Sequence, residues 1–209
     1  MQIIYNEHYK NSDIYPYNET DPSGWYFFNN GFNDIEIQKV KKYSEKMIFD
    51  EGGLAEHQDI DDGINSEIRR SKVSFIPNNE ETLWIYQKIA PMVLEANNNL
   101  WNFDLFGNLE LIQYTKYEGD GTKEGNFYDW HMDLSKSANY RKISVIVQLS
   151  DETEYEGGDV FMKEGLDIQF PREKGTVIVF PSYILHTVTP VVSGLRESLV
   201  IWVSGPPLR

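Results

Sequence analysis

Short apolar runs rich in β-branched residues, bounded by glycine, proline or polar turns, dominate the second half of the chain. The clearest runs are Ile143–Leu149, Thr176–Phe180 and Glu197–Val203, with shorter ones at Asp159–Phe161 and Asp167–Phe170. Short strands at regular spacing are typical of a barrel or a sandwich. We therefore expect this half of the chain to form an antiparallel β barrel.

The end of the barrel is predicted to be a hairpin. A strand should open at His186 and reach Val192, Gly194 should turn the chain, and Glu197–Val203 should return beside it. Glycine is the usual residue where the chain must reverse direction. On this interpretation Arg196 lies one hairpin strand away from His186.

The first half of the chain has the longer hydrophobic period of amphipathic helices. We predict one helix over about residues 34–49, with Asn33 or Asp34 as its N-cap. A second helix is expected over residues 80–97, and Pro91 should kink or split it because proline lacks the backbone N–H.

These patterns predict a mainly β fold with α support. The sequence shows no internal repeat and no linker, so we expect one domain over residues 1–209. Within it, residues 1–105 would supply helical support and lid elements, and residues 106–209 would form the catalytic barrel.

Composition narrows the class of protein. The chain has no cysteine, which excludes disulfides, cysteine-ligated zinc and cysteine nucleophiles. Its formal net charge of -14 disfavours binding to bare nucleic acid. The charge is consistent with a role in solubility alone or with a basic polypeptide partner. There is no apolar run of the ~20 residues that span a membrane, and the N-terminus does not resemble a signal peptide. We therefore expect a soluble cytoplasmic protein.

His131-Met132-Asp133 is the segment with the clearest chemistry. In a strand, residues i and i+2 point to the same face, so this imidazole and carboxylate can converge. His186 would supply a second imidazole. Two histidines and one carboxylate on one face of a metal, with the other positions open, form the arrangement of non-haem Fe(II) oxygenases. A lone His-x-Asp pattern is common, so the prediction depends on its surroundings.

Arg196 follows His186 at hairpin distance. A guanidinium is a fork-shaped, permanently charged partner for a carboxylate. The barrel is therefore expected to hold an acid with two functional ends, one on the metal and one on Arg196. 2-Oxoglutarate has that form.

Four segments then carry a resemblance to a known family. They are YDWHMDLS, RKISVIVQLSDETEYEGGDV, GTVIVFPSYILHTVTPVVSGLR and ESLVIWVSGP. In this order they resemble the 2-oxoglutarate and Fe(II)-dependent dioxygenases, in particular the prolyl 4-hydroxylase-like branch and its small bacterial and phage relatives. The resemblance covers about Leu109 to Pro206 and implies a double-stranded β-helix, a jelly-roll or cupin-like barrel, flanked by N-terminal helices.

The resemblance also implies the catalytic residues and the cofactors. It assigns His131, Asp133 and His186 to iron, and Arg196 to the distal carboxylate of 2-oxoglutarate. The cofactors would be Fe(II), 2-oxoglutarate as co-substrate and dioxygen, with ascorbate as an auxiliary reductant.

Four further positions are assigned by the same resemblance. Tyr117 resembles the tyrosine that lines the co-substrate pocket, and Tyr114 is a second candidate for that role. Ser144 stands where the family often has a small hydroxyl residue facing the co-substrate. Tyr128 resembles a tyrosine near the substrate proline. The segment between Tyr117 and Tyr128 is longer than is usual in the family.

The activity implied is hydroxylation of a prolyl residue in a peptide or protein loop, coupled to decarboxylation of 2-oxoglutarate to succinate and CO2. Two alternatives stay open: hydroxylation of another residue or a free small molecule, and a barrel that binds metal or ligand without turnover. Asp133 argues against an iron halogenase, in which a small residue replaces this carboxylate. Trp202 stands where nucleic-acid demethylases carry a second arginine.

Two glycine-rich segments, residues 51–65 and 116–126, are predicted to frame the iron site, because mobile loops often cover barrel mouths. The carboxylates of Asp59, Asp61 and Asp62 in the first segment would favour a peptide with basic residues beside the proline.

Overall fold

The computed structural model describes residues 24–53, 65–107, 109–135 and 138–207. The two α-helices are α1 (Asp34–Ser44) and α2 (Leu83–Ala96), and α2 continues into a π-helical turn, η4 (Asn97–Trp101). The strands of the first half are β1 (Tyr26–Phe28), β2 (Asp50–Glu51), β3 (Arg69–Arg70) and β4 (Lys72–Ile76). Those of the second half are β5 (Ile112–Glu118), β6 (Phe127–His131), β7 (Arg141–Gln148), β8 (Tyr155–Gly157), β9 (Val160–Glu164), β10 (Leu166–Gln169), β11 (Val177–Pro181), β12 (His186–Val188) and β13 (Val191–Ser204).

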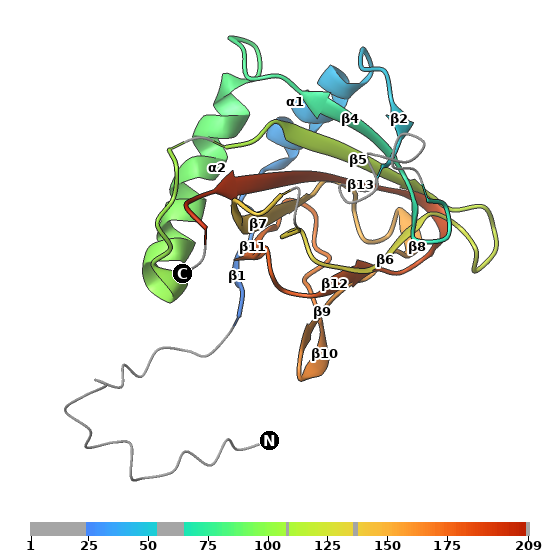
Figure 1. Ribbon diagram of the computed structural model, residues 1–209. Helices are drawn as coiled ribbons and strands as arrows, with labels where there is room; N and C mark the ends of the chain where they lie inside the picture. The colour runs from blue at the N-terminus through green and yellow to red at the C-terminus, as the bar shows by residue number, and fades with distance from the viewer. Residues whose placement is uncertain (1–23, 54–64, 108, 136–137, 208–209) are drawn as a thin grey trace.

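Two antiparallel sheets contain all of these strands. The large sheet has eight strands in the order β1-β11-β7-β13-β5-β4-β2, with β8 paired to β13. The small sheet has five, in the order β10-β9-β12-β6-β3. Both helices lie on the side of the large sheet that faces away from the small one (Figure 1). The first half of the chain therefore contributes strands to both sheets, and it also supplies the helices that cover the large sheet.

The central strands of the large sheet are buried on both faces. Every residue of β11 is buried, as are all but the first residue of β7. A strand covered on both faces has no polar side, so its sequence reads as a continuous apolar run and does not alternate. This explains the runs that predicted the barrel.

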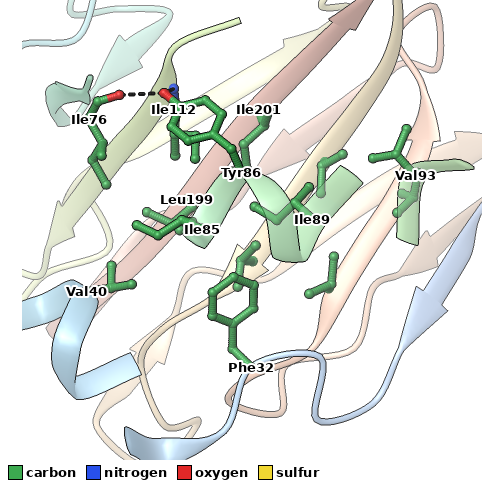
Figure 2. Close-up of a cluster of buried hydrophobic side chains, with 14 of the residues drawn as sticks. Phe32, Val40, Ile76, Ile85, Tyr86, Ile89, Val93, Ile112, Leu199 and Ile201 are labelled. Carbon is green, nitrogen blue, oxygen red and sulfur yellow. Dashed lines mark hydrogen bonds between the residues drawn. The ribbon is translucent and has the colours of Figure 1, made fainter. Parts of the chain in front are cut away.

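One hydrophobic core lies between the large sheet and the helices. Figure 2 shows Ile85, Ile89 and Val93 of α2 against side chains of the sheet such as Leu199 and Ile201. A second core lies between the two sheets and joins side chains such as Phe180 and Met162. Packing on both faces of the large sheet fixes its position relative to the small one.

Helix α1 begins as predicted and ends earlier than predicted. The side chain of Asn33 accepts a hydrogen bond from the backbone N–H of Glu36, and the Glu36 carboxylate accepts one from the N–H of Asn33. This is a capping box, which satisfies two otherwise unpaired donors. The helix ends at Ser44, five residues before the predicted Phe49.

Pro91 was predicted to kink or split the second helix, and it does not split it. Helix α2 runs from Leu83 to Ala96 with Pro91 inside it. Pro91 is exposed, whereas Ile89 and Val93 on either side are buried against the sheet. Burial of the apolar face therefore outweighs the backbone hydrogen bond that proline cannot make.

The predicted hairpin at Gly194 is also wrong. Strand β13 runs unbroken through Gly194, and the break that separates it from β12 falls earlier, at Thr189 and Pro190. Gly194 has φ +79° and pairs with Tyr155 of β8 just after the register shift between Val191 and Ser193, so this glycine accommodates an irregularity within a strand. His186 and Arg196 consequently belong to different sheets.

Strand β5 also differs from the prediction. It spans Ile112–Glu118, so its last three residues fall within the segment 116–126 that was predicted to be a mobile loop. Leu109 makes only an isolated bridge to Val203.

Among the helices of the described part of the chain, none combines the length and apolar character needed to cross a bilayer.

Candidate active site

The structure brings together His131, Asp133 and His186. His131 ends β6 and pairs directly with His186 at the start of β12, so both imidazoles point to one face of the small sheet. The Nε2 atom of His131 lies 3.9 Å from Oδ1 of Asp133, and that of His186 lies 3.6 Å from Oδ2. One potential ligand atom from each of the three residues lies within 4.8 Å of the others.

Backbone carbonyls orient both imidazole rings. Nδ1 of His131 lies 2.7 Å from the carbonyl oxygen of Asp129, and Nδ1 of His186 lies 2.9 Å from that of Ile184. The carbonyls only accept, so each Nδ1 carries the proton and each Nε2 keeps a lone pair directed toward Asp133. Metal-ligating histidines are commonly held in this way. The two nitrogens and the carboxylate therefore fit a divalent cation of the Fe(II) type.

The electrostatics of the site favour the protonation states that a metal requires. Burial lowers the pKa of His131 to about 3, and the neighbouring His186 acts in the same direction. Burial would raise the pKa of Asp133, but the two imidazoles and the hydroxyl of Ser144 outweigh it and hold this pKa below its usual range. A neutral His131 and an ionised Asp133 are the states that bind a cation.

Ser144 supports the carboxylate. Its hydroxyl donates to Oδ2 of Asp133 at 2.6 Å and lies 3.0 Å from the hydroxyl of Ser182. The family resemblance suggested that Ser144 faces the co-substrate. In the structure its hydroxyl instead contacts Asp133, because β7 places it behind the carboxylate.

The three converging residues lie at the wall of a cavity of about 1000 Å³ between the two sheets. Arg196 enters this cavity from β13 of the large sheet and is only 1% exposed. Its NH2 group donates to Oε1 of Gln148 at 2.9 Å, whereas its Nε has no hydrogen-bond partner among the described residues. A buried cationic donor aimed into a cavity is suited to an anionic ligand.

Of the two candidate tyrosines on β5, one lines the cavity and the other does not. Tyr117 pairs with Arg196 across β5 and β13 and lines the cavity, and its ring centroid lies 5.5 Å from the Arg196 guanidinium carbon. Tyr114 is three residues earlier and points to the opposite face, where its hydroxyl donates to Glu197 at 2.7 Å. Tyr114 therefore does not line the cavity, because alternation along a strand puts it in the core beneath the helices.

Tyr128 also lines the cavity. Its ring stacks on His131, with 3.4 Å between ring centroids and 12° between planes. Burial raises the pKa of Tyr128 to about 12, so the phenol is neutral. Its contact with a substrate remains a prediction.

Two arginines of the cavity were not identified from the sequence. Arg69 is buried and lies in the cavity wall. Arg141 also lines the cavity, where its NH2 group donates to the Glu110 carboxylate at 2.8 Å and its guanidinium carbon lies 3.7 Å from the Trp202 ring centroid. Alternation along a strand separates its two faces, but it does not say which face of β3 or β7 turns toward the cavity between the sheets.

The prediction that two glycine-rich segments frame the site can be compared with the structure for the second segment only. Residues 54–64, with the carboxylates of 59–62, lie outside the described residues, although Glu51 and Gly53 beside them line the cavity. None of the residues 119–126 lines the cavity. That loop instead packs beside the start of β13, where the N–H of Gly119 donates to the carbonyl of Gly194. Of the predicted segment 116–126, Tyr117 of β5 lines the cavity, whereas its glycine-rich part does not.

A family model and several curated relatives match the sequence of this chain. The family model described as the 2OG-Fe(II) oxygenase superfamily matches residues 112–204. A PKHD-type hydroxylase of Synechococcus sp. (strain CC9605) is 42% identical over 146 residues, which cover 68% of this chain and 63% of that protein. Another, from Azoarcus sp. (strain BH72), is 36% identical over 99 residues, or 44% of this chain and 42% of that protein. The chain thus spans less than two thirds of the length of these curated relatives.

Comparison with solved structures establishes the fold. A prolyl hydroxylase from Trichoplax adhaerens, solved with a hypoxia inducible factor peptide fragment, superposes with a TM-score of 0.71 at 18% identity, covering 87% of this chain and 84% of that one. A prolyl-4-hydroxylase of Pseudomonas putida gives a TM-score of 0.67 at 18% identity, covering 88% of this chain and 93% of that one. These likenesses confirm the predicted double-stranded β-helix.

Proposed function

Because the chain belongs to the 2OG-Fe(II) oxygenase superfamily, we propose that it is an Fe(II)- and 2-oxoglutarate-dependent hydroxylase that acts on a prolyl residue of a peptide or protein. The membership itself confirms the resemblance carried by the four sequence segments. The observation that supports the activity is the convergence of His131, Asp133 and His186 on the wall of a cavity that also holds Arg196.

His131, Asp133 and His186 would hold Fe(II) through the two Nε2 atoms and the carboxylate. When bound, Fe(II) with 2-oxoglutarate and dioxygen supplies the oxidation of a substrate C–H bond to an alcohol, with succinate and CO2 as the other products. The protein's part is to keep His131 neutral and Asp133 ionised, and to orient all three ligands. Burial keeps His131 neutral, the carbonyls behind each Nδ1 orient the two imidazoles, and the hydroxyl of Ser144 supports the carboxylate.

Arg196 would pair with the distal carboxylate of 2-oxoglutarate. The guanidinium is buried, it lines the cavity, and among the described residues its one hydrogen-bond acceptor is Gln148. Tyr117 lies beside it and lines the same part of the cavity. Arg196 and Tyr117 lie on the large sheet, so the co-substrate would bridge the two sheets.

The rest of the cavity would receive the substrate. Tyr128, Trp130 and Trp202 give it aromatic walls, which suit the flat and apolar ring of proline. Its volume of about 1000 Å³ is at the upper end of the range for small-ligand pockets, so a peptide segment fits beside the co-substrate. Asp50 and Glu51 line its outer rim and would favour basic residues farther from the proline.

Mass spectrometry tests this proposal. The protein would be incubated with Fe(II), 2-oxoglutarate, ascorbate and a pool of proline-containing peptides, and each peptide would be searched for one added oxygen atom on proline. We expect such peptides with the wild-type protein and none with His186→Ala. Succinate without any modified peptide would redirect the search to another residue or a small molecule. The absence of succinate would leave a barrel that binds ligands without turnover.

A further inference from the structure

Arg69 is a buried cation in the cavity wall that the proposed iron and co-substrate chemistry does not use. It lies on β3, directly opposite Tyr128 of β6, and it is 7% exposed. Its guanidinium carbon lies 4.6 Å from the ring centroid of Tyr128, whose other neighbour in the site is His131. The charge is therefore close to the proposed metal ligands.

The surrounding residues fix the position of this guanidinium. Its Nε donates to the Ser71 hydroxyl at 2.8 Å, and its NH1 group donates to the carbonyl of Gly53 at 3.0 Å. The backbone of Gly52 packs directly on it, because a Cβ atom added there would lie 2.7 Å from Nε and 2.9 Å from Cζ. Only a glycine at position 52 allows the guanidinium to occupy this place.

Neutral groups make all of these contacts. In the described part of the chain, no ion pair links Arg69 to a carboxylate, whereas Arg141 pairs with Glu110 and Arg172 pairs with Asp159. Burial of an unpaired cation carries a substantial desolvation penalty. A buried guanidinium that faces a cavity and has no carboxylate partner within residues 24–53, 65–107, 109–135 and 138–207 is therefore suited to bind an anion from outside the chain.

The proposed function leaves this charge without compensation. The two positive charges of Fe(II) and the one of Arg196 equal the one negative charge of Asp133 plus the two of 2-oxoglutarate. Arg141 is already paired within the chain. Arg69 thus adds one positive charge to a filled site, and the remaining component of the reaction is the substrate.

Resting on the proposed function, we propose that Arg69 binds a carboxylate of the substrate, close to the carbon that is hydroxylated. The carboxylate would come either from an acidic side chain beside the proline or from a terminal carboxylate. Asp50 and Glu51 also line the cavity, but both are exposed and neither forms an ion pair with Arg69, so they would contact a different part of the substrate.

Matched probes that differ by one charge test the inference. Calorimetry would measure their binding to the Zn(II)-loaded protein with 2-oxoglutarate present. The probes are end-capped proline hexapeptides with Glu or Gln at each position near the proline, peptides ending in proline as the acid or the amide, and free L-proline with L-prolinamide. For one type of pair we expect the acid to bind about tenfold tighter or more, as a charge-assisted pair would give. The type of pair identifies the source of the carboxylate.

The Arg69→Met variant should lose this preference while its affinity for 2-oxoglutarate stays as in the wild type. Arg70→Met is the matched control, because Arg70 lies on the same strand, stacks on Phe127 and does not line the cavity. Gly52→Ala should also weaken the preference, because it displaces the guanidinium and keeps its charge.

Equal binding of acid and neutral probes in every pair would overturn the inference. So would an Arg69→Met protein that loses 2-oxoglutarate and keeps the acid preference, because Arg69 would then belong to the co-substrate pocket. If Arg69→Met does not fold, Gly52→Ala decides by the same criterion. Failure of the proposed function would be seen separately, as an absence of succinate or of hydroxylated proline in the activity assay.

Discussion

Replacing Arg196 by Met has opposite consequences for the ligand-free and the ligand-bound protein. The guanidinium is 1% exposed, and among the described residues its one hydrogen-bond acceptor is Gln148. Without a ligand it is a buried charge that pairs with no carboxylate of the described chain, and apolar side chains of similar volume often replace such charges without loss of stability. We therefore expect the melting temperature of the ligand-free Arg196→Met protein to equal or exceed that of the wild type.

With 2-oxoglutarate the same change should be costly. Truncating one partner of a buried, hydrogen-bonded charge pair costs about 2–5 kcal/mol. At ~1.4 kcal/mol for each factor of ten, this corresponds to a dissociation constant roughly 30-fold to a few thousandfold higher. The metal site should be unchanged, because Arg196 lies on the other sheet from the three proposed ligands.

Calorimetric titration of 2-oxoglutarate into the Zn(II)-loaded proteins measures this difference. Arg172→Met is the control, since it removes an arginine that pairs with Asp159 and does not line the main cavity. A dissociation constant of Arg196→Met within about threefold of the wild-type value, less than 1 kcal/mol, would refute the assignment. A parallel loss of metal affinity would refute the separation of the two sites.

Three further changes have defined outcomes. Ser144→Ala removes the hydroxyl bonded to Asp133, so competition with a chromophoric chelator should show Fe(II) affinity lower by about 10–100-fold. The pKa of His131 is about 3 in the folded protein, below the ordinary value of 6.5, so on acidification the unfolded chain takes up the proton first. The free energy of unfolding of the metal-free protein should thus fall from pH 7 to pH 4 in urea titrations, and fall less steeply in His131→Gln. Tyr86→Phe removes a hydroxyl that bonds two buried backbone groups (Figure 2), and it should lower the unfolding free energy by about 1–3 kcal/mol without changing 2-oxoglutarate affinity.

Strand periodicity predicts the barrel from local sequence because its central strands are buried on both faces. The same kind of reasoning brings His131 and Asp133 together, since residues two apart on an extended segment share a face. His186 joins them only through the pairing of β12 with β6, a long-range contact that no local pattern contains. The sequence offered His186 as a candidate second imidazole, and the family resemblance assigned it to the metal.

The errors arise where one residue type serves several backbone roles. Gly194 was predicted to reverse the chain, but a positive φ also suits an irregularity within a strand, and pairing with β8 decides between them. Pro91 was predicted to kink or split its helix, and burial of the helix face on the sheet keeps the helix continuous.

Arg69 illustrates what sequence reasoning cannot reach. A basic residue in a short strand is ordinarily a protected edge. Its position in the site depends on Tyr128, which pairs with it across the strands, and on Gly52, which packs on its guanidinium. Neither contact can be predicted from the sequence around Arg69. Only the pairing of β3 with β6 turns its side chain into the cavity.

The release of succinate with Fe(II), 2-oxoglutarate and dioxygen is the most direct measurement of whether this site carries out the proposed chemistry. We expect the wild-type protein to form succinate, and to form it in a one-to-one ratio with hydroxylated product once a substrate is supplied. His186→Ala, checked to be folded, should form none above background, because it removes one of three metal ligands. Succinate formation by His186→Ala at the wild-type rate would contradict the assignment of the site.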